Sequence, residues 1–281
     1  MKITSKNYRF LLVIPTVLIL FSVAVLVNNY TQKGEWFTRS FELTGGTMIT
    51  VEPAEAPSSN AVENALSSFP VSIRTLSGLA GYKLIIQTVS DADVDEILQS
   101  LSNAGIDTTQ YSIQTIGPSL GESFWQQTQL ALVVAFILMG IVVFVLFRDP
   151  FPSMYVIFCA LCDIVVTVAF MDLFGIELSM ASLGALLMLL GYSVDTDIML
   201  TTRFLKETEP FGQKIRSAIK TGLTMTGTTL GALFALYISG ISPVITQIAS
   251  VLIIGLIADI MLTWFQNSVL LRMYMTKKGL L

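Results

Sequence analysis

Four acidic residues lie inside apolar segments of this sequence, where a charge is costly. Asp163, Asp195, Asp197 and Asp259 each fall within a run that is long enough to cross a membrane. A carboxylate at mid-bilayer costs roughly 2.5–3.5 kcal/mol on insertion scales, so it must face a protein interior, find a partner or take up a proton. Arg203 lies near the end of the run that holds Asp195 and Asp197, and its long side chain could reach the membrane surface there. These residue types would suit a relay of proton-carrying groups.

Asp195 and Asp197 cannot both face one interior, because residues two apart on a helix point about 200° away from each other. Asp195 shares a stripe of the helix with Gly191 and Arg203. We therefore predict that Asp195, assisted by Arg203 and by the acids of the neighbouring runs, titrates during a working cycle. Asp197 is the alternative, and which of the two faces the interior is open at this point.

Small and polar residues form stripes on the last two apolar runs. The final run carries four of them at intervals of four, on one face over about 18 Å of helix: Gly255, Asp259, Thr263 and Asn267. The run before it carries Gly227, Thr228 and Gly231. Small residues at this spacing allow helices to approach closely. The stripes therefore indicate either packing between helices or a path that water and protons can reach.

The overall composition excludes several kinds of site. Of 281 residues, 53% are apolar and 13% are charged, against about a quarter charged in soluble chains. The absence of histidine removes imidazole bases and histidine metal ligands, and a net charge of −4 without a basic patch argues against nucleic acid. Cys159 and Cys162 lie in an apolar run and are expected to pack as small residues. We expect no cofactor, no metal and no enzymatic activity.

Six apolar runs are long enough for membrane-spanning helices, which need about 20 residues. They are approximately Phe10–Val27, Phe124–Phe147, Ser153–Leu173, Leu178–Phe204, Ile219–Ile238 and Ile245–Leu271. The first lacks a small-x-small cleavage site, which favours an uncleaved span over a signal peptide. We therefore expect a polytopic α-helical membrane protein divided into residues 1–27 with the first span, residues 28–123 as an extracytoplasmic domain, and residues 124–281 as a bundle of five spans.

The distribution of basic residues indicates the orientation. Twelve of the sixteen Lys and Arg residues lie in the N-terminus, two loops and the C-terminal tail, which fall on one side if there are six spans. Positively charged loops tend to remain in the cytoplasm. We predict a protein of the cell membrane with both termini in the cytoplasm.

The segment between the first two spans is the part that can fold in water. Its pattern predicts a strand at Ser40–Glu52, a helix at Ala61–Phe69, strands at Val71–Leu76 and Tyr82–Thr88, a helix capped by Asp91 that runs to Ala104, and a strand at Tyr111–Ile116. The order β-α-β-β-α-β predicts a ferredoxin-like α+β domain. Its acids are spread along solvated faces, so they are expected to provide solubility rather than catalysis.

Three motifs resemble the SecD/SecF protein-export family of the resistance-nodulation-division (RND) superfamily. They are Phe41-Glu42-Leu43-Thr44-Gly45-Gly46-Thr47, the segment Gly191-Tyr192-Ser193-Val194-Asp195-Thr196-Asp197 continuing to Arg203, and Gly255 through Asn267. The resemblance covers essentially the whole chain, and the fourth-span motif is similar to that of archaeal SecF. Where bacterial members carry an Asp-Thr pair, Asp195-Thr196 can align with it, which leaves Asp197 as an extra acid.

The resemblance implies an accessory subunit of the Sec machinery that performs no covalent chemistry. SecD would be its partner, the pair would associate with the Sec translocation channel, and the proton motive force would aid export of the translocating polypeptide. The outward domain would contact the emerging chain at the surface of the membrane lipids. Two alternatives remain: a subunit of an RND transporter of small molecules or lipids, for which the insert is small, and an intramembrane hydrolase, which would need Asp195 and Asp259 on facing helices.

Overall fold

The membrane part of the chain consists of long apolar helices. The computed structural model describes residues 8–79, 81–88, 93–206 and 210–279. Within these residues, six helical segments are long and apolar enough to cross a membrane, which confirms the number and order of the predicted spans. They are η2 with α1 (Tyr8–Leu12 and Val13–Lys33), α5 (Pro118–Phe147), α6 (Pro150–Leu173), α7 (Met180–Lys206), α8 (Phe211–Ser239), and α9 with η3 and α10 (Pro243–Leu262, Thr263–Asn267 and Ser268–Lys277). The chain is therefore a multi-pass membrane protein.

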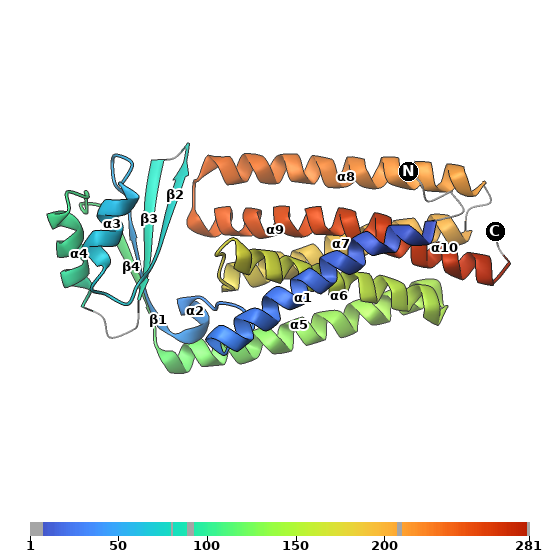
Figure 1. Ribbon diagram of the computed structural model, residues 1–281, viewed down its shortest axis with the longest axis horizontal. Helices are drawn as coiled ribbons and strands as arrows, with labels where there is room; N and C mark the ends of the chain where they lie inside the picture. Colours follow the sequence, from blue (N-terminus) through green and yellow to red (C-terminus); the bar gives the residue numbers. More distant parts are fainter. Residues whose placement is uncertain (1–7, 80, 89–92, 207–209, 280–281) are drawn as a thin grey trace.

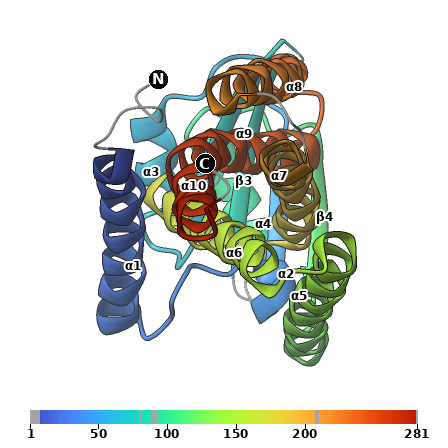
Figure 2. The same cartoon turned by 90° about the vertical axis from the view of Figure 1, so that its right-hand side faces the viewer.

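The spans divide into a central group and a peripheral group (Figures 1 and 2). In α6, α7 and α9, 56% of the most apolar stretch is buried, against 11%, 6% and 17% in α1, α5 and α8. Figure 2 shows α1, α5 and α8 around the outside of α6, α7 and α9. The stripe of Gly227, Thr228 and Gly231 on α8 is exposed and does not join the interior of the described chain.

A small α+β domain interrupts the chain between α1 and α5. It contains α2 (Phe41–Thr44), β1 (Gly46–Val51), α3 (Ser59–Leu66), β2 (Ser72–Gly78), β3 (Gly81–Thr88), α4 (Val94–Asn103) and β4 (Tyr111–Ile116). The strands form one antiparallel sheet in the order β2-β3-β1-β4. Alternate residues such as Ile49, Val51, Leu84 and Ile86 pack against α3 and α4 in a fully buried core. The helices cover the face of the sheet that points away from the spans (Figure 1).

Two local predictions for this domain differ from the structure. The expected strand from Ser40 begins only at Gly46, because Phe41–Thr44 forms a helical turn that buries Leu43 against the spans. The helix expected to be capped by Asp91 is capped by Asp93, whose carboxylate accepts the backbone N–H groups of Asp95 and Glu96. Asp91 itself lies outside the described residues.

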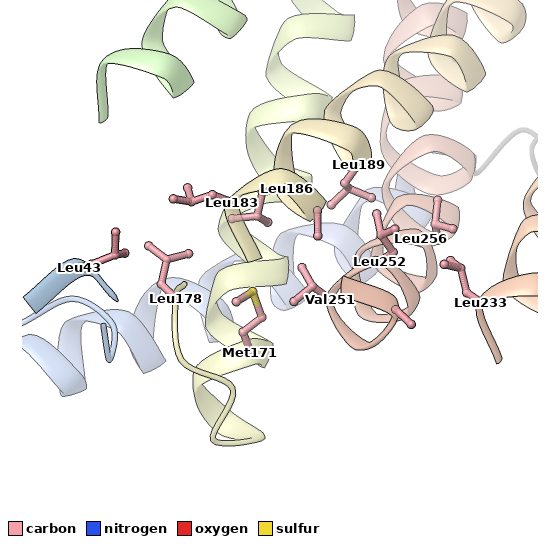
Figure 3. Close-up of a cluster of buried hydrophobic side chains, with 12 residues drawn as sticks. Leu43, Met171, Leu178, Leu183, Leu186, Leu189, Leu233, Val251, Leu252 and Leu256 are labelled. Carbon is pink, nitrogen blue, oxygen red and sulfur yellow. The ribbon is translucent and has the colours of Figure 1, made fainter. Parts of the chain in front are cut away.

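The domain is anchored to the adjacent ends of the spans by a shared apolar core (Figure 3). Leu43 of α2 lies with Met171 of α6, Leu178 of the α6–α7 loop and the leucines of α7 and α9. Backbone hydrogen bonds reinforce this contact, since the N–H of Ser40 donates to the carbonyl of Leu178 and the N–H of Leu178 donates to that of Thr38, both at 2.8 Å.

The two glycines of the first motif allow the turn from α2 into β1. Gly45 has φ +83° and Gly46 has φ +155°, which side chains rarely tolerate. A Cβ at Gly45 would lie 2.6 Å from the Cα of Pro118, where α5 begins, so a larger residue would push the first turn of α5 away. The motif thus fixes the domain at the entry to the second span.

Candidate functional site

Three carboxyl groups from three different spans lie buried in the centre of the bundle. Asp163 of α6, Asp197 of α7 and Asp259 of α9 are each at most 1% exposed. Their helices are the central ones, and α9 packs against both α6 and α7. The structure therefore brings together three of the four acids that the sequence singled out.

A single hydroxyl joins two of these carboxyls. The Oγ1 of Thr263 lies 3.0 Å from the Oδ1 of Asp197 and 3.0 Å from the Oδ1 of Asp259. The side-chain amide of Asn267 donates a second hydrogen bond of 2.7 Å to the same oxygen of Asp197. Asp197, Thr263 and Asn267 are all fully buried, so α7 and α9 are linked by polar contacts that water does not reach.

The third carboxyl, that of Asp163, accepts a hydrogen bond from a serine of α7. The hydroxyl of Ser193 donates a hydrogen bond to the Oδ2 of Asp163. Ser193 is fully buried and lies four residues before Asp197, so both side chains fall on the inner face of α7. The role of Ser193 as a donor to another span was not predicted, since a serine in an apolar run is equally typical of simple packing.

The helix geometry of the last span changes at this site. Residues Thr263–Asn267 form a π-helical turn, in which the N–H of Ser268 donates to the carbonyl of Thr263 five residues earlier. A π turn widens the helix and is frequent at functional sites. Thr263 and Asn267 stand at its two ends and both point at Asp197. No residue pattern in the sequence indicated this turn.

The site holds polar atoms whose hydrogen-bonding capacity is not used. Among the described residues, the Oδ1 of Asp163, the Oδ2 of Asp197 and the Oδ1 of Asn267 are buried without a hydrogen-bond partner. None of the ion pairs within the described part of the chain includes Asp163, Asp197 or Asp259. Ionised carboxylates are rarely buried without a cation or a full set of donors. The arrangement therefore suits carboxyl groups that hold protons.

The choice between Asp195 and Asp197 is decided by the packing of α7. Asp197 faces the interior, whereas Asp195 is exposed on the opposite side of the helix, as their 200° separation requires. The stripe assumed for Asp195 does not enter the interior, so this residue does not join the cluster. It also does not face Asp259, which removes the geometry on which the hydrolase alternative depended.

Arg203 lies apart from the three carboxyls. Its guanidinium donates to the hydroxyl of Thr221 at 2.9 Å and also to that of Ser217, both on α8. It therefore links α7 and α8 at the end of the bundle that lies away from the α+β domain.

The other motif residues divide into buried contacts and exposed positions. Gly255 permits the contact of α9 with α7, because a side chain there would collide with Leu189. Gly227 and Gly231 have no neighbour within 4 Å of an added Cβ, so the close helix approach predicted for them does not occur within the described chain. The exposed positions are Gly191, Tyr192 and Thr228.

The two cysteines contribute to apolar packing, as predicted. Cys159 and Cys162 are buried and free, and they pack with Val166 and Leu262 in one apolar cluster. Within the residues that the structure describes, no group of three or more Cys, Asp or Glu side chains is arranged to hold a metal ion.

Known proteins with similar sequences are protein-export components. The family described as "Protein export membrane protein SecD/SecF, C-terminal" matches residues 96–277. The "Protein-export membrane protein SecF" of Pyrococcus furiosus is 38% identical over 95% of this chain and 91% of its own length. That of Methanocaldococcus jannaschii is 38% identical over 97% of both chains.

A solved structure has the same fold. SecDF of Thermus thermophilus, described as a translocon-associated membrane protein, superposes with a TM-score of 0.74 over 96% of this chain at 21% identity. The present chain spans 38% of that longer protein. Because the sequence matches extend over nearly the full length at well above 30% identity, the chain belongs to the SecF family of protein-export membrane proteins.

Proposed function

We propose that this chain acts with SecD as an accessory subunit of the Sec machinery and promotes protein export across the cell membrane with energy from the proton motive force. Its relatives are named protein-export membrane proteins, and its structural neighbour is described as translocon-associated. The single observation that supports proton coupling is the buried cluster of Asp163, Asp197 and Asp259 with its unused oxygen atoms. A proton that crosses 100 mV releases about 2.3 kcal/mol, which the cluster would convert into movement of its helices.

The bridge through Thr263 supports the presence of at least one proton. A threonine hydroxyl has one hydrogen and two acceptor lone pairs. It can donate to only one of the two Oδ1 atoms that lie 3.0 Å away, those of Asp197 and Asp259. The other contact is a full hydrogen bond only if that carboxyl is protonated and donates to the hydroxyl. One added or removed proton therefore changes an attractive contact between α7 and α9 into a repulsive one.

The consequence for the mechanism is a switch in the packing of the central helices. With the shared proton, Asp197 and Asp259 hold α7 against α9. Without it, two carboxylates meet in a dry site, and like charges there repel strongly. Separation of the helices or entry of water would relieve the repulsion. Alternation between these two states during proton passage would move the outer ends of the spans, on which the α+β domain stands.

The exposed side of α7 supports a contact with SecD. An acid within a span is not expected to face lipid, yet Asp195 is exposed. Gly184 and Gly191 on the same helix, and Gly227 and Gly231 on α8, have open space where a Cβ would lie. Small residues with a polar side chain among them are typical of contacts between membrane helices. SecD would supply both the close helix and a hydrogen-bond donor for Asp195.

We further propose that about residues 28–123 form a ferredoxin-like sandwich that lies outside the cell membrane. The order of the elements and the antiparallel strand order β2-β3-β1-β4 support this fold. The excess of Lys and Arg in the segments at the other end of the bundle supports cytoplasmic termini and an outward domain. The domain would then contact the polypeptide as it emerges.

The test compares two isosteric substitutions in cells whose export depends on this chain. Asp197→Asn removes the proton-carrying group from the cluster, whereas Asp195→Asn changes an acid outside it. In the wild type, an uncoupler abolishes the part of export that depends on the proton gradient. We expect Asp197→Asn to lose that part. Asp195→Asn should keep the uncoupler-sensitive part of export, provided that SecD still copurifies with this variant.

Two results would contradict the proposal. Undiminished, uncoupler-sensitive export with Asp197→Asn would remove the cluster from proton coupling. Loss of uncoupler-sensitive export with Asp195→Asn alone, in complexes that retain SecD, would assign the proton to the exposed acid instead.

A further inference from the structure

A large cleft separates the α+β domain from the ends of the spans. Its volume is about 1100 Å³, and it lies between the uncovered face of the sheet and the outer ends of α6, α7, α8 and α9. Figure 1 shows the sheet standing across this end of the bundle, with α3 and α4 on its far side. Pockets for small molecules usually measure about 300–1,000 Å³. The cleft is therefore large enough for a segment of a polymer.

Buried polar atoms without partners line this cleft. The hydroxyls of Ser40 and Thr246 and the Oε2 of Glu177 have no hydrogen-bond partner among the described residues. All three residues are buried, at 2%, 6% and 6% exposure. The other oxygen of Glu177 is used, because it pairs with Arg74 of β2 at 3.0 Å. Buried polar atoms usually have partners, so these three indicate a ligand with hydrogen-bonding groups, and the free oxygen of Glu177 requires a hydrogen-bond donor.

The polarity of the cleft differs between its two walls. The sheet contributes mostly polar side chains, including Thr50, Gln87, Ser112 and Gln114. The spans contribute a mixed wall, in which apolar side chains such as Phe234 and Ile253 alternate with polar ones such as Gln247 and Ser250. A ligand that fills the cleft must therefore present hydrogen-bonding groups to both sides and apolar groups to part of the span side.

The charge of the cleft limits the ligand further. Four acidic residues line it, Glu42, Glu52, Asp172 and Glu177, against the basic residues Lys33 and Arg74. A net negative site with a free carboxylate oxygen disfavours the phosphate of an anionic lipid. It favours a neutral or cationic ligand that is rich in N–H donors.

We propose that this cleft binds an extended segment of the polypeptide being exported, an inference that rests on the export function proposed above. An extended chain offers N–H and C=O groups along its length and points alternate side chains to opposite sides, so it can supply hydrogen bonds and apolar contacts to both walls. The four strands, about 4.8 Å apart, form a wall roughly 15–19 Å wide, and an extended chain rises about 3.3 Å per residue. About five residues can therefore cross the sheet, and segments with apolar and basic side chains should bind best.

Photo-crosslinking in cells identifies the occupant. A benzophenone amino acid replaces Ser112, which lies on β4 in the cleft, and in a second strain it replaces Ser102, which is exposed on α4 away from it. Ultraviolet light during export should crosslink the Ser112 position to the exported polypeptide and the Ser102 position much less. Equal crosslinking at both positions, or crosslinking of Ser112 to lipid or to SecD alone, would overturn the inference.

Binding to the purified full-length chain in complex with SecD tests the chemistry. The probe is a fluorescein-labelled peptide of leucine, glutamine and lysine, compared with one that carries glutamate in place of lysine. We expect tighter binding of the lysine peptide and a loss of about tenfold in affinity with Ser112→Trp, because the larger side chain would block part of the cleft. The matched change Ser102→Trp should leave the affinity unchanged. Absence of binding, or equal affinities for the two variants, would refute the cleft as a peptide site.

The two proposals fail separately in these experiments. If the chain is required for proton-dependent export but Ser112→Trp changes neither peptide affinity nor crosslinking, the export function stands and the cleft is not the binding site. If export does not depend on the chain at all, the proposed function fails, whatever the result with the peptide.

Discussion

Thr263 connects two buried carboxyls, and its replacement by valine tests whether that connection holds α7 and α9 together. Valine keeps the β-branched shape but removes the hydroxyl that lies 3.0 Å from both Asp197 and Asp259. Hydrogen bonds to charged groups contribute about 1.5–3 kcal/mol, and a buried acceptor left without a partner costs about 1–3 kcal/mol. After the change Asp197 keeps the bond from Asn267, while the Oδ1 of Asp259 loses the contact. We therefore expect Thr263→Val to lower the free energy of unfolding by about 1.5–3 kcal/mol.

Thr201 provides a matched control for this change. It is a fully buried threonine on α7, and its hydroxyl has no hydrogen-bond partner among the described residues. Thr201→Val therefore removes an unsatisfied hydroxyl and should leave stability unchanged or raise it by up to about 1 kcal/mol.

The assay is equilibrium unfolding of the purified protein in mixed micelles, followed by helical circular dichroism. Proton-dependent export of the same variants gives the functional readout, in which Thr263→Val should be impaired and Thr201→Val should not. Equal unfolding free energies for the two valine variants would refute the reasoning, because the hydroxyl bridge would then contribute nothing that a lone buried hydroxyl does not.

Two further predictions concern the surface of the bundle and the end of the bundle that lies away from the α+β domain. Gly191→Leu fills the open space on the exposed side of α7, so we expect less SecD to copurify. A similar enlargement at an exposed position of α5, Ala131→Leu, should have no effect. Equal recovery of SecD with the two variants would exclude this side of α7 as the contact. At the end of the bundle away from the α+β domain, partial burial favours a higher pKa for Asp149. Hydrogen bonds from Lys278, at 2.8 Å, and from Tyr274 outweigh this effect of burial and hold the pKa below its usual value. Such a carboxylate stabilises the folded state above its unfolded pKa of about 3.9. That contribution is lost as the pH falls through the pKa of Asp149 in the folded state. The melting temperature of the wild type should therefore fall more than that of Asp149→Asn between about pH 5 and pH 3. An equal fall in the melting temperatures of the two proteins would contradict this prediction.

Several features could be read from the sequence because they depend on local composition or on period. The six spans follow from apolar length alone, and the strand Tyr111–Ile116 was predicted with the bounds that the structure has. The opposition of Asp195 and Asp197 follows from helix geometry. The helical turn Phe41–Thr44 was missed because its stability comes from burial of Leu43 against distant spans, and its own four residues carry no helix signal.

The candidate site was predicted in part. The sequence located the acids and the stripe of Asp259, Thr263 and Asn267, because the cost of burying polar groups in a membrane makes each of them conspicuous. It did not reveal that Ser193 donates to Asp163, that one hydroxyl joins two carboxyls, or that a π turn directs Thr263 and Asn267 at Asp197. These contacts join residues between 30 and 70 positions apart, and no local pattern encodes such a distance.

The sequence alone determined that this chain spans the membrane six times, that a small α+β domain follows the first span, and that acids lie at membrane depth. Hydropathy and residue period are properties of each segment and need no knowledge of its neighbours. Only the tertiary structure decided that α6, α7 and α9 form the interior, that Asp197 rather than Asp195 faces it, and that a cleft with unpartnered polar atoms lies beneath the sheet. The reason is that a helix has an inner side only when other helices pack against it.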